Sequence, residues 1–537
     1  MKPRLLLTAL FALVVADRSP ALDLASATVA DLEALMAKGE LSSEKLTATY
    51  LARIAAYDKQ GPAINTVITL NAHALDEARR LDAERKAGKI RGPLHGIPIV
   101  LKDNYDTYDL PTTGGSQLLA GNVPPDDAYV VKKLRDAGAI ILAKLNLSEW
   151  AGGGGSTSGA PPDIALLGAV PNGFSSMGLQ TKNPHALDRG PAGSSGGTGA
   201  AIAASFAQLG MGTDTGGSVR GPSSVNGIVG LKPTHGLLSR DGIIPLALSF
   251  DTGGPMARSV YDVALVLGVM TGIDPADPAT QKSAGKSSTD YTQFLKVGAL
   301  KGAHLGIARD FMGKDAGTDA VVEAAIAKLK SLGASVVDVK FPAYLLQSKQ
   351  ALSSLIMNAE FKAQITDYLK TTQPGYPKSF DDIVARSNDP KTGYRSPEKA
   401  FALKYSQSVA LNLDDPAYLA AVHEGLALTT AAVLAVFERH HLDAIIYPAS
   451  PRPAQLIKPS APTPSDSPAN LANQTGFPDL IVPAGFTPEG LPVTISFFGP
   501  AFSEPTLLAY GYDFEQATKA RRLPLFTPAL SADKLGQ

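Results

Sequence analysis

The sequence contains no cysteine among its 537 residues. This absence excludes enzymes with a cysteine nucleophile, metal sites built from thiolates, and a disulfide-stabilised scaffold. Histidine is also scarce: eight are scattered along the chain, and the one adjacent pair, His440 and His441, would point to different faces of a helix. We therefore expect no metal site.

The chain also lacks an excess of charge of either sign. Its 49 Lys and Arg residues balance 50 Asp and Glu residues, for a formal net charge of −1. Binding to nucleic acid or to an anionic membrane requires a basic surface, so we expect neither as a partner. Hydrophobic residues make up 44% of the sequence, which is ample for a large core. We predict a single domain over residues 22–537.

No apolar run near the N-terminus is long enough to span a bilayer. Residues 5–16 form an apolar stretch of 12 residues that follows Lys2 and Arg4. Small residues at Ala16 and Ala21 fit cleavage by a signal peptidase, so residues 1–21 are predicted to be a secretory signal peptide. The protein would then be exported, to the periplasm or outside the cell. The alternative is an apolar N-terminal helix that packs on the domain.

Two turns rich in glycine and serine are the most informative part of the sequence. Residues 193–197 read Gly-Ser-Ser-Gly-Gly, and residues 214–218 read Asp-Thr-Gly-Gly-Ser. Between them Ile202, Phe206 and Leu209 recur at helical spacing, which predicts a buried helix. Because glycine permits close approach of the backbone, each turn can present a hydroxyl beside unpaired N–H groups. Such an arrangement suits acyl transfer.

A lysine follows a short strand-like run earlier in the chain. Residues 97–101 are apolar and mostly β-branched, which places Lys102 at the end of a predicted strand. A helical stretch through Val130, Val131 and Leu134 then leads to a second strand over residues 139–143, as in a βαβ unit. Open α/β sheets carry their active sites at such strand ends.

These segments together resemble the amidase signature family. The resemblance rests on the two turns, the Ala-rich segment between them, the sequence Gly-Leu-Lys-Pro-Thr at residues 230–234, and a C-terminal pattern from residue 473 onward. It implies an α/β fold, with a mixed β-sheet covered by helices on both faces. It also implies hydrolysis of a carbon–nitrogen acyl bond in a small-molecule or peptide amide, without a cofactor, by a monomer or a homodimer.

The resemblance also assigns a catalytic triad. Ser218, which lies 24 residues after Ser194, matches the family's nucleophile at the family's spacing. Ser194 matches the relay serine, and Lys102 matches the base. A free lysine has a pKa near 10.4, so burial would have to lower this pKa by about three or four units. In the family the peptide bond before the relay serine, here Gly193–Ser194, is cis.

The second turn supplies the remaining expectations. By resemblance, the backbone N–H groups of Thr215, Gly216 and Gly217 form the oxyanion hole. Asp214 and Arg220 flank this turn, and we expect them to form an ion pair that braces it rather than to take part in the chemistry.

Three short segments narrow the range of expected substrates. Residues 148–151, 241–245 and 251–256 resemble bacterial peptide amidases, which remove C-terminal amide groups. The Gly-rich loop over residues 151–177 is longer than in those enzymes. A peptide amide is therefore the first expectation, and an anilide or a carbamate is the alternative within the family.

Two interpretations from other classes remain. Residues 193–197 also satisfy Gly-x-Ser-x-Gly, which would make Ser195 the nucleophile of an α/β-hydrolase esterase. That motif needs a strand directly before it, whereas residues 183–190 contain turn residues. The other interpretation is a non-catalytic protein like the related component of tRNA-dependent amidotransferases. The predicted export signal argues against this role, because charged tRNA is cytosolic.

Overall fold

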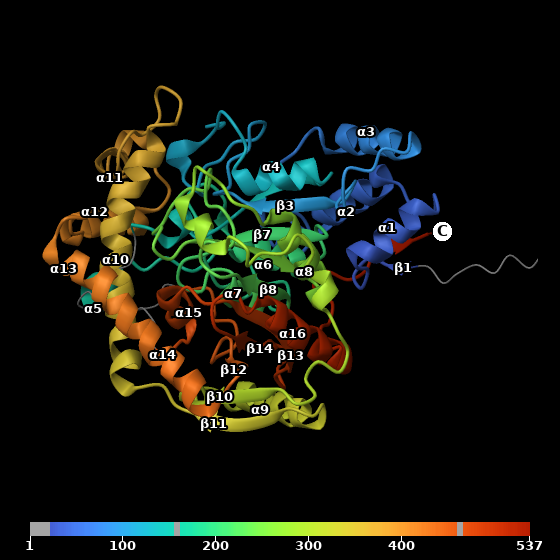
Figure 1. The fold of residues 1–537 in the computed structure, drawn as a ribbon. Helices are drawn as coiled ribbons and strands as arrows, with labels where there is room; N and C mark the ends of the chain where they lie inside the picture. The colour runs from blue at the N-terminus through green and yellow to red at the C-terminus, as the bar shows by residue number, and fades with distance from the viewer. Residues whose placement is uncertain (1–21, 155–161, 459–465, 537) are drawn as a thin grey trace, which may run out of the picture.

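The computed structural model describes residues 22–154, 162–458 and 466–536. The predicted signal peptide, residues 1–21, lies outside the described residues, as does part of the predicted loop over residues 151–177. An 11-stranded mixed sheet runs through the middle of the molecule, and helices surround it (Figure 1).

The sheet combines parallel and antiparallel neighbours. Its strands, in spatial order, are β11 (Ser335–Val339), β10 (His304–Ala308), β12 (Ala444–Pro448), β14 (Pro492–Phe498), β13 (Asp479–Phe486), β8 (Val229–Lys232), β9 (Thr252–Ala257), β7 (Leu209–Asp214), β3 (Pro98–Lys102), β4 (Ile140–Leu145) and β2 (Val67–Leu70). Two small antiparallel pairs are β1 (Leu22–Asp23) with β15 (Lys534–Leu535), and β5 (Phe174–Ser175) with β6 (Leu179–Gln180).

Helices account for much of the remaining described chain. They are α1 (Val29–Ala37), α2 (Ser43–Tyr57), α3 (Ala74–Lys86), α4 (Tyr129–Asp136), α5 (Pro162–Leu167), α6 (Gly196–Ala203), α7 (Arg220–Val225), α8 (Val260–Met270), α9 (Ala316–Ser331), α10 (Ala343–Leu369), α11 (Phe380–Ser387), α12 (Pro397–Val409), α13 (Pro416–Ala420), α14 (Leu426–His440), α15 (Ala469–Thr475) and α16 (Glu504–Thr518).

Both faces of the sheet are covered, as the alternation along β13 and β14 shows. Leu480 and Val482 of β13 lie directly against Gly511 of α16. Side chains alternate between the faces of a strand, so Pro483, which follows Val482, and its cross-strand partner Thr494 of β14 point to the other face. There the hydroxyl of Thr494 donates to Ser224 of α7. The predicted mixed sheet with helices on both faces is therefore confirmed.

The predicted βαβ unit is formed by β3, α4 and β4. β3 and β4 are parallel neighbours, and the helix between them buries Val130, Val131 and Leu134. β7 lies parallel to β3 on its other side, with Leu101 opposite Met211. Because the carboxyl ends of parallel strands meet at one edge of a sheet, the end of β3 and the end of β7 are brought together.

The helix predicted between the two turns is shorter than its apolar spacing indicates. α6 ends at Ala203, Phe206 lies in the connection, and Leu209 is the first residue of β7. The spacing of the three apolar residues is therefore not that of one helix, and this part of the prediction is wrong. β7 reads Leu-Gly-Met-Gly-Thr-Asp and is hydrogen-bonded to β3 and β9, so pairing with neighbouring strands determines its conformation.

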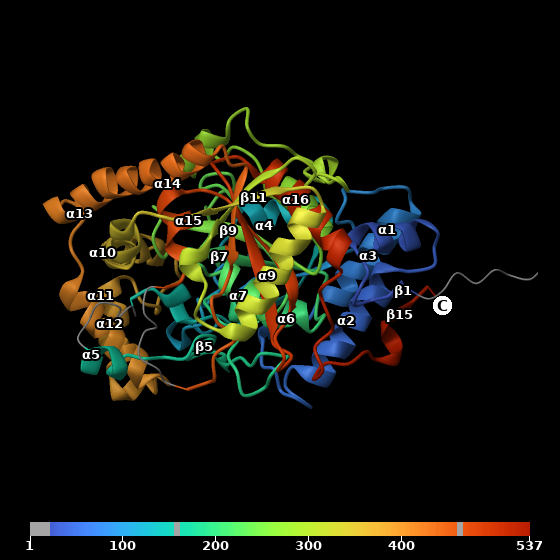
Figure 2. The same cartoon turned by 90° about the horizontal axis from the view of Figure 1, so that it is seen from below.

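Helices α10 to α14 form a layer at one edge of the molecule (Figures 1 and 2). Phe361 of α10 packs against Gly153 and Gly154, where any added side chain would meet the phenyl ring. Tyr368, also on α10, donates its hydroxyl to Asp106, at 2.7 Å. The layer is thus attached to the loops that follow β3 and β4.

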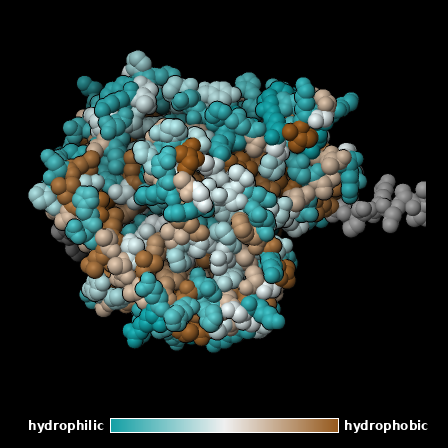
Figure 3. Space-filling view, in the orientation of Figure 1, coloured by the Kyte–Doolittle hydropathy of each residue, from teal (hydrophilic) through white to brown (hydrophobic). Residues whose placement is uncertain are grey.

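One segment of this layer has an unusual composition. α13, the π-helical turn Ala421–Gly425 and α14 form a continuous helix, Pro416–His440. Its most apolar 18-residue window has a mean hydropathy of 1.7, and 22% of that window is buried. By length and composition alone it could cross a bilayer, so the prediction of no membrane span stays unconfirmed. In Figure 3 apolar residues are interspersed with polar ones on the side where this layer lies.

Candidate active site

Three segments meet at the edge of the sheet where β3 and β7 end. Lys102 is the last residue of β3, and the turn over residues 214–218 begins at the last residue of β7. Ser194 and Ser195 lie immediately before α6. The backbone N–H of Ser195 donates to the carbonyl oxygen of Ser218, at 3.2 Å, which joins the two Gly/Ser turns directly.

Lys102 is fully buried between the two turns. Its Nζ donates to Ser194 Oγ and to Thr213 Oγ1, each at 2.7 Å. Burial lowers the pKa of Lys102 to about 7, although the negative charges of Asp214 and Asp251 oppose this shift. A large fraction of this amine is therefore neutral at neutral pH, as a proton acceptor must be.

Ser194 is buried, and its Oγ accepts the hydrogen bond from Lys102. Its carbonyl oxygen accepts from the backbone N–H of Ser148, at 3.0 Å. The Gly193–Ser194 peptide bond is cis, as the resemblance implies. These contacts hold Ser194 between Lys102 and the second turn.

Ser218 is half-buried, whereas the neighbouring Gly216 is exposed. Within the described parts of the chain, no hydrogen bond joins Ser218 Oγ to Ser194 Oγ or to any other group. The hydroxyl of Ser218 is thus free to meet a substrate. Hydrogen bonds of this kind are often long without substrate and tighten in the complex.

The second turn is held by the Asp214 carboxylate. It accepts hydrogen bonds from the backbone N–H groups of Gly217, at 2.9 Å, and Val219, at 3.0 Å. The Arg220 guanidinium contacts Asp214 at 3.0 Å and Asp479 at 2.9 Å, which confirms the predicted ion pair. Burial favours the neutral form of Asp214, but the charge of Arg220 outweighs it and keeps the pKa of Asp214 below its usual range.

The same contacts change the expected oxyanion hole. The N–H of Gly217 is already donated to Asp214, so it is not available as this structure stands. The N–H groups of Thr215 and Gly216 have no hydrogen-bond partner among the described residues. Two of the three predicted donors are therefore free among the described residues: that of Gly216, which is exposed, and that of Thr215, which is buried.

Ser195 has a structural role. It is fully buried, and its Oγ lies 3.2 Å from both the carbonyl oxygen and the N–H of Thr213. The residues directly before it form turns rather than a strand. Both observations contradict the α/β-hydrolase interpretation, in which Ser195 would be an exposed nucleophile after a strand.

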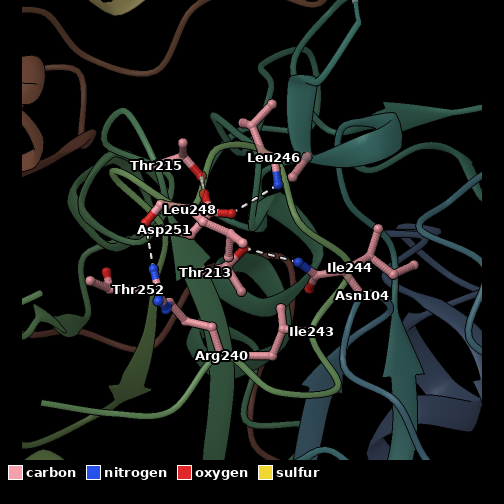
Figure 4. Close-up of a pocket in the computed structure, with 11 residues that line it drawn as sticks. Asn104, Thr213, Thr215, Arg240, Ile243, Ile244, Leu246, Leu248, Asp251 and Thr252 are labelled. Carbon is pink, nitrogen blue, oxygen red and sulfur yellow. Dashed lines mark hydrogen bonds between the residues drawn. The ribbon is translucent and has the colours of Figure 1, made fainter. Parts of the chain in front are cut away.

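Sequence reasoning missed two residues of this site. Thr213 accepts hydrogen bonds from Lys102 and, at 3.1 Å, from Asn104. Asp251 accepts a short hydrogen bond from the hydroxyl of Thr215. Thr213, Thr215 and Asp251 line a cavity of about 10 Å³, large enough for roughly one water molecule (Figure 4). Asp251 is the first residue of the segment 251–256, which resembles peptide amidases. This resemblance was the signal in the sequence that could have identified Asp251 as a site residue.

Among the described residues, no group of three or more His, Asp or Glu side chains is placed to hold a metal ion. His235 is buried, which lowers its pKa to about 3, with the charge of Arg240 acting in the same direction. This histidine is neutral at neutral pH, and its Nε2 lies 2.9 Å from the carbonyl oxygen of Leu248.

Comparison with known proteins places this geometry in context. The sequence model of the family described as Amidase matches residues 45–508. A glutamyl-tRNA(Gln) amidotransferase subunit from Moorella thermoacetica is 36% identical over 505 residues, which are 92% of this chain and 97% of that protein.

Solved structures agree with the sequence comparison. The native peptide amidase from Stenotrophomonas maltophilia is 41% identical, with a TM-score of 0.84 over 93% of this chain and 99% of that one. An amidase family protein from Bacillus anthracis is 32% identical, with a TM-score of 0.81 over 93% of this chain and 92% of that one.

Proposed function

Because this chain belongs to the amidase family and is an amide-hydrolysing enzyme, we propose that it cleaves its substrate with a Ser-Ser-Lys triad. Ser218 is the nucleophile, Ser194 the relay and Lys102 the base. One observation carries the proposal: Lys102 is buried, has a pKa of about 7, and donates directly to Ser194. An ordinary surface lysine would be protonated and unable to accept a proton.

The reaction proceeds in two steps. Ser218 Oγ attacks the amide carbonyl while its proton passes to Ser194, and the proton of Ser194 passes to neutral Lys102. The C–N bond then breaks, the relay returns a proton to the leaving amine, and an acyl-enzyme remains on Ser218. Water attacks this ester by the same route in reverse and releases the acid.

Charge that develops on the carbonyl oxygen needs donors aimed at it. The free N–H groups of Thr215 and Gly216 supply them, and each such donor is worth on the order of 3 kcal/mol of barrier. The N–H of Gly217 contributes indirectly, because its bond to Asp214 holds the turn in shape.

The proposed substrate is a peptide amide that releases ammonia, and a monomer or homodimer acts on it without a cofactor. Similarity to the Stenotrophomonas peptide amidase over nearly the whole chain supports this substrate. A second candidate is ammonia release from glutamine, which the similarity to the Moorella amidotransferase protein favours. Anilides and carbamates remain the alternative suggested by the loop over residues 151–177.

We also propose that the protein is exported by its N-terminal segment. Support comes from the residues alone, namely Lys2 and Arg4 followed by the short apolar stretch. Export fits a small amide better than a charged tRNA as the substrate.

The Ser218→Ala variant is expected to lower amide turnover by a factor on the order of 10⁴ or more without loss of fold, because it removes the attacking atom. A serine-reactive acyl probe followed by peptide mass spectrometry should place the adduct on Ser218. The Ser195→Ala variant is the control and should still be labelled at Ser218. An adduct on Ser195, or inactivation by a metal chelator, would contradict the mechanism.

Activity is expected to fall as the pH is lowered through about 7, because protonation of Lys102 removes the base. A profile of kcat/KM against pH measures this decrease, which forms the acid limb of the profile. Lys102→Ala should lower turnover strongly at every pH. His235→Ala should leave the acid limb in place, since His235 is neutral throughout this range. If the histidine variant lost the limb and Lys102→Ala kept activity, a histidine-based mechanism would replace this one.

Substrate class is tested with a panel of a dipeptide amide, glutamine, an anilide, a carbamate and an ester. We expect ammonia release from the dipeptide amide to have the highest kcat/KM. Preference for glutamine would favour the amidotransferase-like function, and preference for the anilide or carbamate would favour the alternative within the family. Absence of turnover for every substrate would refute hydrolysis.

Export is tested by expressing the full chain in a bacterial host and sequencing the N-terminus of the exported protein. We expect it to begin at Leu22, after cleavage behind Ala21, or at Asp17, after cleavage behind Ala16. A chain that lacks residues 2–21 should stay in the cytoplasm. A mature protein that still begins at Met1 would rule out the signal peptide.

A further inference from the structure

Asp251 lies beside the second turn although 36 residues separate it from Thr215. It comes directly before β9, whose first residue, Thr252, pairs with Asp214 at the end of β7. Its Oδ1 accepts from the hydroxyl of Thr215. Its Oδ2 accepts from the backbone N–H groups of Leu246, at 2.8 Å, and Ala247, at 3.0 Å. Figure 4 shows the carboxylate between Thr215 and Leu246.

The second turn is thus held at two points. Asp214 fixes its far part through Gly217 and Val219, whereas Asp251 fixes its start through the side chain of Thr215. Thr215 also carries one of the two free N–H groups proposed for the oxyanion hole. A displacement of about 1 Å at such a donor can cost on the order of a hundredfold in rate.

We infer that Asp251 is a positioning residue of this site, which orients Thr215 for the oxyanion and keeps a negative charge near Lys102. The inference rests on the function proposed above. The two carboxylate oxygens and the charge of Asp251 act separately. One oxygen holds Thr215, the other holds the loop at Leu246, and the negative charge acts on Lys102 through space.

Charged groups from several elements surround this carboxylate. Asp251 and Asp214, at the end of β7, both act through space on Lys102 at the end of β3. Arg240 lines the same cavity, and its guanidinium is paired with Asp277. Burial raises the pKa of Asp251 to about 6, although the bond from Thr215 opposes this. The group is therefore ionised above about pH 6, where its charge favours protonated Lys102.

The Asp251→Asn variant separates the charge from the contacts. An asparagine can accept the N–H groups at Leu246 with its oxygen and donate to Thr215 Oγ1 with its nitrogen. Loss of the negative charge lowers the pKa of Lys102, so the acid limb of kcat/KM should move to lower pH by about half a unit. A limb that stays in place or moves to higher pH would overturn the inference.

The Thr215→Val variant removes the hydrogen bond and keeps the carboxylate. We expect a loss of kcat on the order of ten- to a hundredfold with little change in KM, because the oxyanion forms only in the transition state. Thr215→Ser keeps the hydroxyl and should retain most of the activity. Equal activity of the valine and serine variants would overturn the positioning role, even if the Asp251 variant failed to fold.

Asp262→Asn is the matched control. Asp262 is also a fully buried aspartate with a pKa raised to about 6 by burial, but its contacts are with Val29, Gln208 and Ser259. Its loss should affect stability and leave the acid limb in place. Labelling of Ser218 by the acyl probe is measured in the same samples. Labelling without a shift in the Asp251 variant refutes only this inference, whereas absence of labelling in the unmodified enzyme refutes the proposed triad.

Discussion

The site depends on the burial of Lys102 without a carboxylate in contact. Lys144, on the neighbouring strand β4, is buried to the same extent but lies 3.2 Å from Asp103, so its charge is compensated. Among the residues that the structure describes, Lys102 Nζ forms hydrogen bonds only with the hydroxyls of Ser194 and Thr213. Taking an unpaired ammonium out of water disfavours its charged form, which makes the neutral amine accessible near pH 7. Burial also lowers the pKa of Lys144, but the contact with Asp103 opposes that shift, whereas Lys102 has no such contact within the described ranges.

Around this lysine, the fixed charges support the backbone. The Asp214–Arg220–Asp479 network is almost entirely buried, and Asp479 also accepts from the hydroxyl of Tyr447, at 2.9 Å. A buried ion pair contributes little net stability, but loss of one partner leaves an uncompensated charge and costs about 3–5 kcal/mol. The network therefore holds the second turn in a conformation in which the N–H groups of Thr215 and Gly216 have no partner among the described residues.

The conformation of the turn and the chemistry of the lysine are linked through the sheet. β7 carries Thr213 and Asp214, β3 carries Lys102, and β9 begins beside Asp251. Side chains positioned by strands are held more precisely than side chains on free loops, because the ladder on either side restricts each backbone. The helical layer of α10 to α14 lies outside this arrangement but contacts the loop before Asp251, because Gln364 and Glu360 of α10 accept from the backbone N–H groups of Leu248 and Ser249.

The sequence alone was sufficient to predict those features of the protein that depend on short segments of the chain. Two Gly/Ser turns and a lysine after a short apolar strand are each built from a few adjacent residues. They carried the family resemblance, which implied the fold class and the assignment of Lys102, Ser194 and Ser218. Three features were decided only by tertiary structure. Leu209 belongs to a strand because β3 and β9 supply its hydrogen bonds, although its spacing fits a helix.

The other two features involve partners far apart in the chain. The N–H of Gly217 is unavailable as a donor because it is bonded to Asp214, which Arg220 keeps ionised. Arg220 is itself paired with Asp479, 259 residues further along the chain. Asp251 reaches Thr215 only because β7 and β9 are paired. Local patterns specify backbone conformation, but the pKa of a lysine and the availability of an N–H group depend on what folding brings next to them.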